Sequence, residues 1–368
     1  MRLENASLYL DRASSADNTG LLALVAEAPV VTPAFSYILD RAPDYFAFSR
    51  FQGEKTQIQV AHSSEKEVLG TISVVHDRVW LRGQPQPVAY TADLRVSQRA
   101  RGLGLGDRLM QNAMALARGA SDQPVFTVVM KDNPVGLKMN ANLARDGIAE
   151  MRKVAEIRLY FFLALPCLKA PGAYQSHPAQ VSDLREMHAL WVRVKRGQNL
   201  ARAWSYDDWL AWIQAVPELE ISDYLLARNQ AGELCGFFAV WNQQALRRIR
   251  LTQSGFALRS LRTVWNTFHG VWGLPLLPGA GQILPVCQVL NLCVAPEHRR
   301  ALSVLLSSAL AGLRKQDALL LGMALDLQDP LNHELKHFIA STSDLYLLSN
   351  ADFGAARPGL FHLEIGWG

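Results

Sequence analysis

The most informative part of the chain reads Val96-Ser97-Gln98-Arg99-Ala100-Arg101-Gly102-Leu103-Gly104-Leu105-Gly106. It lies between a predicted strand that ends at Val96 and a predicted amphipathic helix over 105–118. Glycines let the backbone turn tightly and let its N–H groups approach a ligand without interference from a Cβ atom. The helix start adds unpaired N–H donors and the positive end of the helix dipole, and two arginines add charge. Together these features predict a cradle for a pyrophosphate.

Two other nucleotide-binding loops do not fit this pattern. A Rossmann loop needs a glycine where Asp107 stands, and it follows the first strand of its domain, whereas this loop follows the fourth predicted strand. A Walker loop needs Gly-Lys-Ser/Thr, which is absent. The alternative that stays open is a helix start that uses glycines only for its turn.

The same residues resemble the acetyl-CoA loop of the GNAT superfamily of N-acyltransferases, whose pattern is Gln/Arg-x-x-Gly-x-Gly/Ala. Arg101, Gly104 and Gly106 fill that pattern, and the triplet Arg99, Gly102, Gly104 also fits. The family's proline in this loop is replaced by Gln98. The resemblance covers about residues 6–165 and, weakly, 180–367. It implies a mixed-sheet α/β fold, acetyl-CoA or another acyl-CoA as co-substrate, and transfer of the acyl group to an amine.

The resemblance also implies where the co-substrate lies. In the family, the acyl-pantetheine arm occupies a gap between the strand before the loop and the next strand, and it pairs with backbone groups there. Residues 130–133 would line the far side of that gap, ending at the asparagine with which the family's later motif often begins. The implied CoA-binding residues are Leu94, Val96, Arg99, Arg101, Gly102, Leu103, Gly104, Leu105, Gly106, Asp107 and Asn133.

The catalytic groups of the family are not obvious in this sequence. Many members carry a general base six or four residues before the valine, where this chain has Tyr90 and Ala92. Tyrosine has an unperturbed pKa near ~10 and is a poor base. Asp93 is a carboxylate, but strand alternation puts it on the opposite face from Tyr90. The position of the family's tyrosine acid holds Asn140.

Tyr90 and Asp93 are therefore the catalytic candidates. We expect Tyr90 to hold an ordered water or the acceptor, with the amine losing its proton through water. Two alternatives stay open. A β-bulge would flip Asp93 toward the cleft, or a residue of the C-terminal half, such as Gln288, would complete the site.

The order of predicted elements occurs twice, which indicates two related domains. Residues 1–165 form the predicted acyl-CoA-binding domain, 166–179 a proline-containing linker, and 180–368 a second, degenerate copy. Its loop keeps Val294 and Arg299 but has Leu302 and Val304 at the glycine positions, where side chains should crowd a pyrophosphate. A helix is also predicted at 33–39, and a terminal strand at 360–365.

Composition limits the class of protein. The 368 residues are 49% hydrophobic and 19% charged with a net charge of +4, which favours a globular protein and suits an anionic ligand without demanding nucleic acid. No signal-peptide pattern is recognised, and the longest apolar run, about 159–168, is too short to span a membrane. Four cysteines without a CxxC pair argue against structural zinc and favour a reduced, cytoplasmic protein without a metal.

The predicted partner is a small-molecule or peptide amine, with no nucleic acid and no membrane, and the sequence leaves the oligomeric state open. One basic stretch, with five arginines over 247–262, is interleaved with Phe256, Trp265 and Phe268 and could bind an acidic acceptor or an RNA backbone. A charged surface over core aromatics is the alternative interpretation of that stretch.

Overall fold

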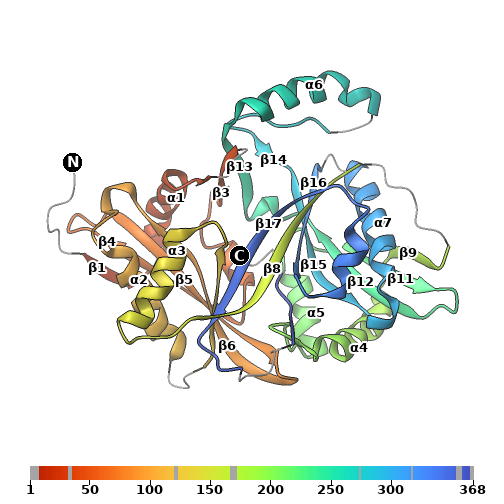
Figure 1. Cartoon of the computed structure of the whole chain (residues 1–368), viewed down its shortest axis with the longest axis horizontal. Coiled ribbons are helices and arrows are strands. Elements are labelled where there is room, and N and C mark those ends of the chain that lie inside the picture. Colours follow the sequence, from red (N-terminus) through yellow and green to blue (C-terminus); the bar gives the residue numbers. More distant parts are fainter. Residues whose placement is uncertain are drawn as a thin grey trace.

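The computed structural model of the chain describes residues 8–31, 35–119, 123–165, 172–272, 275–315, 318–353 and 359–364. Within them, a mixed sheet of twelve strands runs through the whole molecule (Figure 1). In sheet order its strands are β1 (Tyr9–Arg12), β4 (Lys55–His62), β5 (Val68–Leu81), β6 (Gln84–Val96), β7 (Val125–Met130), β17 (Ala340–Ser349), β8 (Arg152–Leu163), β16 (Leu320–Asp326), β15 (Val286–Val294), β12 (Leu234–Trp241), β11 (Tyr224–Asn229) and β9 (Tyr174–Pro178).

Helices cover both faces of the N-terminal half of this sheet. The amphipathic helix α2 (Leu105–Arg118) buries Leu105, Leu109 and Ala113 in one core cluster with Val74 of β5 and Ala89 of β6. Helix α3 (Pro134–Arg145) packs beside α2 (Figure 1). On the other face, α1 (Asn18–Glu27) packs against side chains of β4 and β5.

The C-terminal half repeats this arrangement. β15 runs parallel to β16, as β6 runs parallel to β7, and α7 (Ala301–Lys315) follows β15 as α2 follows β6. Helices α4 (Leu184–Lys195) and α5 (Tyr206–Ala215) contribute to the core on the other face of this half. The predicted repeat therefore has a structural counterpart in strand order and direction.

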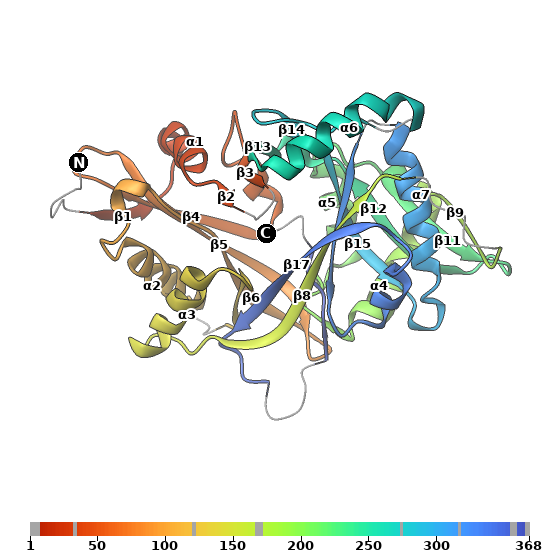
Figure 2. The same ribbon diagram turned by 45° about the horizontal axis from the view of Figure 1, so that its top comes forward.

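The two halves exchange a strand at the centre of the sheet. β17, from the C-terminal half, lies between β7 and β8 and pairs antiparallel with both. β8, from the N-terminal half, lies between β17 and β16. The C-terminal strand β17 therefore lies next to β7, and the N-terminal strand β8 lies next to β16. The sheet continues without a break from one half to the other (Figures 1 and 2).

A second, four-stranded sheet connects the halves away from this seam. It contains β2 (Val30–Val31), β3 (Phe35–Asp40), β13 (Arg248–Ser254) and β14 (Ile283–Leu284), and β3 pairs with β13 from the other half. The helix predicted at 33–39 is thus wrong. The structure forms β3 there because the partner strand β13, about two hundred residues later, satisfies its backbone, which no local pattern reveals.

Two further predictions need correction. The predicted linker includes β9, which pairs with β11 at the edge of the large sheet, so residues 174–178 are not a linker; 166–171 lie outside the described residues. The predicted terminal strand is short: β18 (Leu360–Phe361) pairs in parallel with β10 (Gln198–Asn199). Residues 362–364 follow it without strand structure, and 365 is not described.

Candidate functional site

The glycine loop opens onto free space in front of α2. Gly102 has a φ of 82° and Gly104, the residue before the helix, a φ of 70°. A Cβ atom built on either glycine would meet no heavy atom of the described chain within 4 Å. Their left-handed conformation requires glycine, and the surrounding space leaves the backbone accessible to a ligand. The residues therefore fit a phosphate cradle at a helix start.

Gly106 has a different role from the other two glycines. A Cβ there would lie 2.5 Å from Cε of Met139 on α3. Gly106 thus allows α2 and α3 to pack closely. Asp107, on the same helix turn, accepts a hydrogen bond from Asn142 of α3 at 2.9 Å. Both predicted ligand residues connect the two helices in this structure.

The remaining residues of the predicted set divide between the surface and the core. Arg99, paired with Glu67, and Arg101 are exposed, and Leu103 is 42% exposed beside them. Leu105, the first residue of α2, is buried in the core, and Leu94 and Val96 pack, partly buried, against the same cluster. Asn133 caps α3, where its side chain accepts a hydrogen bond from the Gly136 N–H at 3.0 Å.

The strands beside the loop separate where the resemblance expects the acyl-pantetheine arm. β6 and β7 pair in parallel at Ala89–Val125, Tyr90–Phe126 and Thr91–Thr127. Beyond these pairs, residues 92–96 and 128–130, all within the described chain, have no pairing with each other. The gap between the two strands therefore begins at Thr91 and opens toward the glycine loop.

A β-bulge lies at the start of this gap. Arg95 pairs with Thr71 and Ala92 with Ser73, so Asp93 and Leu94 together oppose a single residue of β5. Asp93 has a φ of 56°. The extra residue breaks the alternation of side chains. Asp93 is thereby on the same face as Tyr90, and the expectation that it faces away is corrected by the bulge.

Asp93 is held by a buried ion pair rather than presented as a free base. Its carboxylate lies 2.5 Å from Nη2 of Arg41, and both side chains are almost fully buried. Burial alone would raise the pKa of Asp93, but Arg41, with Arg95 and Arg247, outweighs burial and lowers it. Burial and the nearby Asp93 raise the pKa of Tyr90, so the phenol stays protonated at neutral pH. Neither group is a strong general base in this state.

A cavity of about 80 Å³ begins beside Tyr90, on the sheet face opposite α2. Its wall is mainly apolar, and residues of both halves of the chain line it. Its polar lining comes from Gln52, Asp77, Arg202, His362 and Glu364, and its other lining residues are Tyr90, Val75, Val79, Val88, Phe126, Leu200 and Leu363. A group that extends past the end of the strand gap would enter this cavity, since α2 covers the other face.

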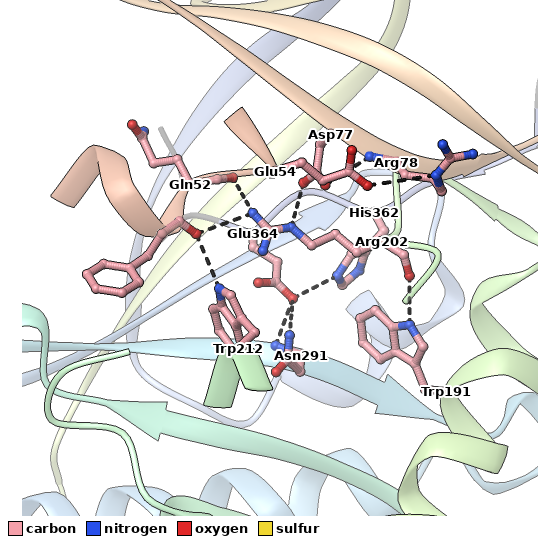
Figure 3. A network of polar contacts seen from close by, with 11 residues as sticks. Gln52, Glu54, Asp77, Arg78, Trp191, Arg202, Trp212, Asn291, His362 and Glu364 are labelled. Atoms are coloured by element: carbon pink, nitrogen blue, oxygen red, sulfur yellow. Dashed lines mark hydrogen bonds and ion pairs between the residues drawn. The ribbon is translucent and has the colours of Figure 1, made fainter. Parts of the chain in front are cut away.

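The polar end of the cavity is a buried hydrogen-bonded network (Figure 3). Nζ of Lys195 lies 3.0 Å from Nδ1 of His362, whose Nε2 lies 3.2 Å from a carboxylate oxygen of Glu364. Burial and Lys195 lower the pKa of His362 to about 4, so its ring is neutral at pH 7. Nε2–H then donates to Glu364, and Nδ1 accepts from Lys195. Sequence patterns missed this group because its members come from two segments far apart in the chain.

On the opposite side of the network, Nε of Arg202 lies 2.7 Å from a carboxylate oxygen of Asp77. This ion pair joins a residue of the C-terminal half to β5. Burial raises the pKa of Asp77, with Arg202 opposing the shift. This pair closes the cavity on the β5 side, so both halves are needed to form the wall.

In the C-terminal half, the bulge position that corresponds to Asp93 is already occupied by a contact within the chain. Its bulge residue, Asn291, also has a positive φ, 53°, but its N–H donates to the Glu364 carboxylate at 2.7 Å. Helix α7 begins at Ala301, seven residues after Val294, whereas α2 begins nine residues after Val96. Leu302 is buried in the core and does not crowd a loop. The shorter loop, rather than the leucine side chain, distinguishes this half.

No metal-binding arrangement appears among the described residues, since no three His, Cys, Asp or Glu side chains converge. The described cysteines, Cys235, Cys287 and Cys293, are buried free thiols, and Cys167 lies outside the described residues. No helix in the described part of the chain is both long and apolar enough to cross a membrane.

Comparisons with known proteins agree with this geometry. The model of the acetyltransferase (GNAT) family matches residues 30–139, which include the bulge, the glycine loop and α2. A search of curated proteins finds no match.

Solved structures share the fold over nearly the whole chain. One is the GCN5-related glucosamine N-acetyltransferase region of a fungal multi-domain GH3 β-N-acetylglucosaminidase. The two are 16% identical with a TM-score of 0.61, and the match covers 94% of this chain but only 38% of that one. N-myristoyltransferase of Saccharomyces cerevisiae, solved with bound myristoyl-CoA, has 12% identity and a TM-score of 0.63, covering 97% of this chain and 85% of that one.

A GCN5-related N-acetyltransferase from Sphaerobacter thermophilus has 13% identity and a TM-score of 0.57, covering 96% of this chain and 98% of that one. At such identities the likeness concerns the fold. The shared fold and the matched segment identify the chain as a GNAT-fold protein whose residues 30–139 match the acetyltransferase family.

Proposed function

We propose that the chain transfers an acyl group from acyl-CoA, with acetyl-CoA as the simplest donor, to an amine acceptor. The observation that carries this proposal is the combination of an open glycine loop with a strand gap that starts at Thr91 and leads to a cavity. Backbone N–H groups of 101–106 hold the pyrophosphate, and the pantetheine arm follows the gap toward the bulge. The likeness to acyltransferases of known structure supports the choice of donor.

The acceptor enters from the cavity side. The cavity has a volume of about 80 Å³ and a mainly apolar wall, so a small aliphatic group of the acceptor fits it. The amine then meets the thioester carbon at the end of the strand gap. Its nitrogen attacks that carbon, the C–S bond breaks, and CoA leaves as a thiol. Holding the two reactants in this geometry accounts for much of the lowering of the barrier.

The proton of the amine leaves through water in this proposal. Tyr90 remains protonated and Asp93 remains paired with Arg41, so neither removes it efficiently. Tyr90 donates a hydrogen bond to the water or the acceptor instead. The amine therefore reacts in its neutral form, which becomes more abundant as the pH rises toward the pKa of the acceptor.

The second candidate is an acyl-CoA-binding protein without catalysis, favoured by the ion pair that occupies Asp93. Calorimetry of the full chain with CoA and acetyl-CoA tests the donor site, and thiol release over a panel of amines tests transfer. Donor binding with thiol release above the amine-free rate supports the enzyme. Donor binding without such release over the panel supports the binding protein, and a folded protein that binds neither donor contradicts both.

A further inference from the structure

Helix α6 (Phe256–Trp272) and the described part of the loop after it, 275–282, project from the body of the molecule (Figures 1 and 2). They connect β13 to β14. Hydrogen bonds join the loop to the helix: Nε1 of Trp265 donates to the Pro275 carbonyl at 2.9 Å, and the side-chain amide of Asn266 bonds the backbone of Leu277. The helix and the loop therefore form a small unit of their own.

One face of this unit is apolar and exposed to solvent. Leu261, Val264 and Phe268 are 53%, 57% and 47% exposed, and their spacing puts them on one side of the helix. Leu276 of the loop is 55% exposed. Four of the ten large apolar side chains that are exposed in the described residues thus fall within 261–276. Such clustering marks an interaction surface, whereas single exposed apolar residues are ordinary.

The charge of the same region has one sign. No Asp or Glu occurs between Glu233 and Glu297, although the whole chain has 33 acidic residues in 368. Arg259 and Arg262 of α6 are exposed. Of the other arginines of the basic stretch, Arg250 pairs with Asp40 at 2.7 Å and Arg248 with the same carboxylate at 3.4 Å, and Arg247 is buried. The projecting unit therefore presents apolar side chains together with positive charge.

We propose that α6 and its loop dock onto the surface of a phospholipid bilayer that contains anionic lipids. A helix with an apolar face and arginines on its polar side lies in the plane of the membrane interface, with the apolar side chains below the headgroups. The arginines then meet anionic headgroups. Absence of a spanning helix among the described residues does not bear on this mode of binding, because it uses one helix face only. The proposal is independent of the acyl transfer proposed above.

The experiment is co-sedimentation of the full chain with phosphatidylcholine vesicles that contain either no phosphatidylglycerol or about a quarter of it. The wild type is expected to bind the anionic vesicles and to lose binding between about 0.1 M and about 1 M salt. Leu261→Ser with Phe268→Ser should weaken binding about tenfold or more, because the buried apolar area is lost. Arg259→Gln with Arg262→Gln should weaken it by about fivefold for each arginine.

Matched controls use exposed residues elsewhere. Val181→Ser removes a 71% exposed apolar side chain, and Arg152→Gln removes an arginine that is 61% exposed. Both should bind vesicles as the wild type does, and thermal unfolding should show that all variants are folded. No binding to anionic vesicles, or equal losses in the controls, would overturn the proposal. It would also be overturned if the chain dimerises through this face, seen as a doubled mass in sedimentation that Leu261→Ser with Phe268→Ser abolishes, while vesicles leave it unbound.

Discussion

Gly104→Ala separates the ligand role of the glycine loop from its structural role. Gly104 has a φ of 70°, and a Cβ there meets no heavy atom of the described chain within 4 Å. The variant therefore suffers no clash, and its cost in the free protein is the strain of a left-handed residue, about 1–2 kcal/mol. If Gly104 had only a structural role, the variant would lose this stability but keep its affinity for CoA.

A bound pyrophosphate changes the expectation. The new methyl group would occupy the space through which the ligand approaches the N–H groups at the start of α2. Loss of one hydrogen bond to a charged group costs about 1.5–3 kcal/mol. The affinity for CoA should therefore fall by about ten- to a hundredfold, since each 1.4 kcal/mol corresponds to a factor of about ten.

Gly147→Ala is the matched control. Gly147 has a φ of 69°, and a Cβ there also meets no heavy atom within 4 Å, but it follows α3 rather than preceding α2. Both variants should lose similar stability in thermal unfolding. Calorimetry with CoA should show a weakened Gly104→Ala and an unchanged Gly147→Ala. Equal affinities for CoA in the two variants would refute the assignment of the loop as the pyrophosphate site.

Three further predictions concern the centre of the site. Asp93→Asn keeps a residue that tolerates the positive φ but leaves Arg41 buried without its carboxylate, so the free energy of unfolding should fall by about 3–5 kcal/mol; Arg41→Gln with Asp93→Asn should recover part of it, and additive losses in this double-mutant cycle would contradict the pairing. The pKa of His362 is about 4, whereas that of an unfolded histidine is near ~6.5, so the free energy of unfolding should fall as the pH drops from about 6.5 to about 4. His362→Gln should flatten that part of the dependence of melting temperature on pH. If the variant keeps the wild-type dependence, His362 is not the group that titrates there. Val88→Phe should fill the cavity and abolish transfer while CoA affinity by calorimetry stays unchanged, and full transfer activity would mean that the acceptor binds elsewhere.

Local signals were sufficient for much of the fold. The prediction of a mixed α/β fold of the GNAT type is confirmed, and the helix predicted at 105–118 has those bounds, because its apolar spacing and its glycine start are both local. The turn between β5 and β6 is local in the same way: Arg82 and Gly83, with positive φ at both residues, join the two strands. Such features are determined by residues that are close in the sequence, so the spacing of residue types is enough to predict them.

Features that depend on distant partners were missed or misread. β17 has no predicted counterpart, although it pairs with both β7 and β8 at the centre of the sheet. The bulge at Asp93 depends on its register with β5, and one extra residue leaves the composition of the strand unchanged. His362 and Glu364 follow a strand of two residues, so no periodicity points to them. Their chemistry arises only where Lys195 and Asn291 meet them in the fold.

The strand exchange links the two halves through the proposed site. The glycine loop depends on β6, α2 and α3, all from the N-terminal half, whereas the cavity is closed by Arg202 and residues 362–364 from the other half. The strand next to β7 is β17, so residues 1–165 alone would leave the edge of β7, beside the strand gap, unpaired. An unpaired edge is free to bind other chains. The proposed donor site and the proposed acceptor cavity therefore both depend on the full chain, although the pattern that indicates the donor lies within eleven residues of its sequence.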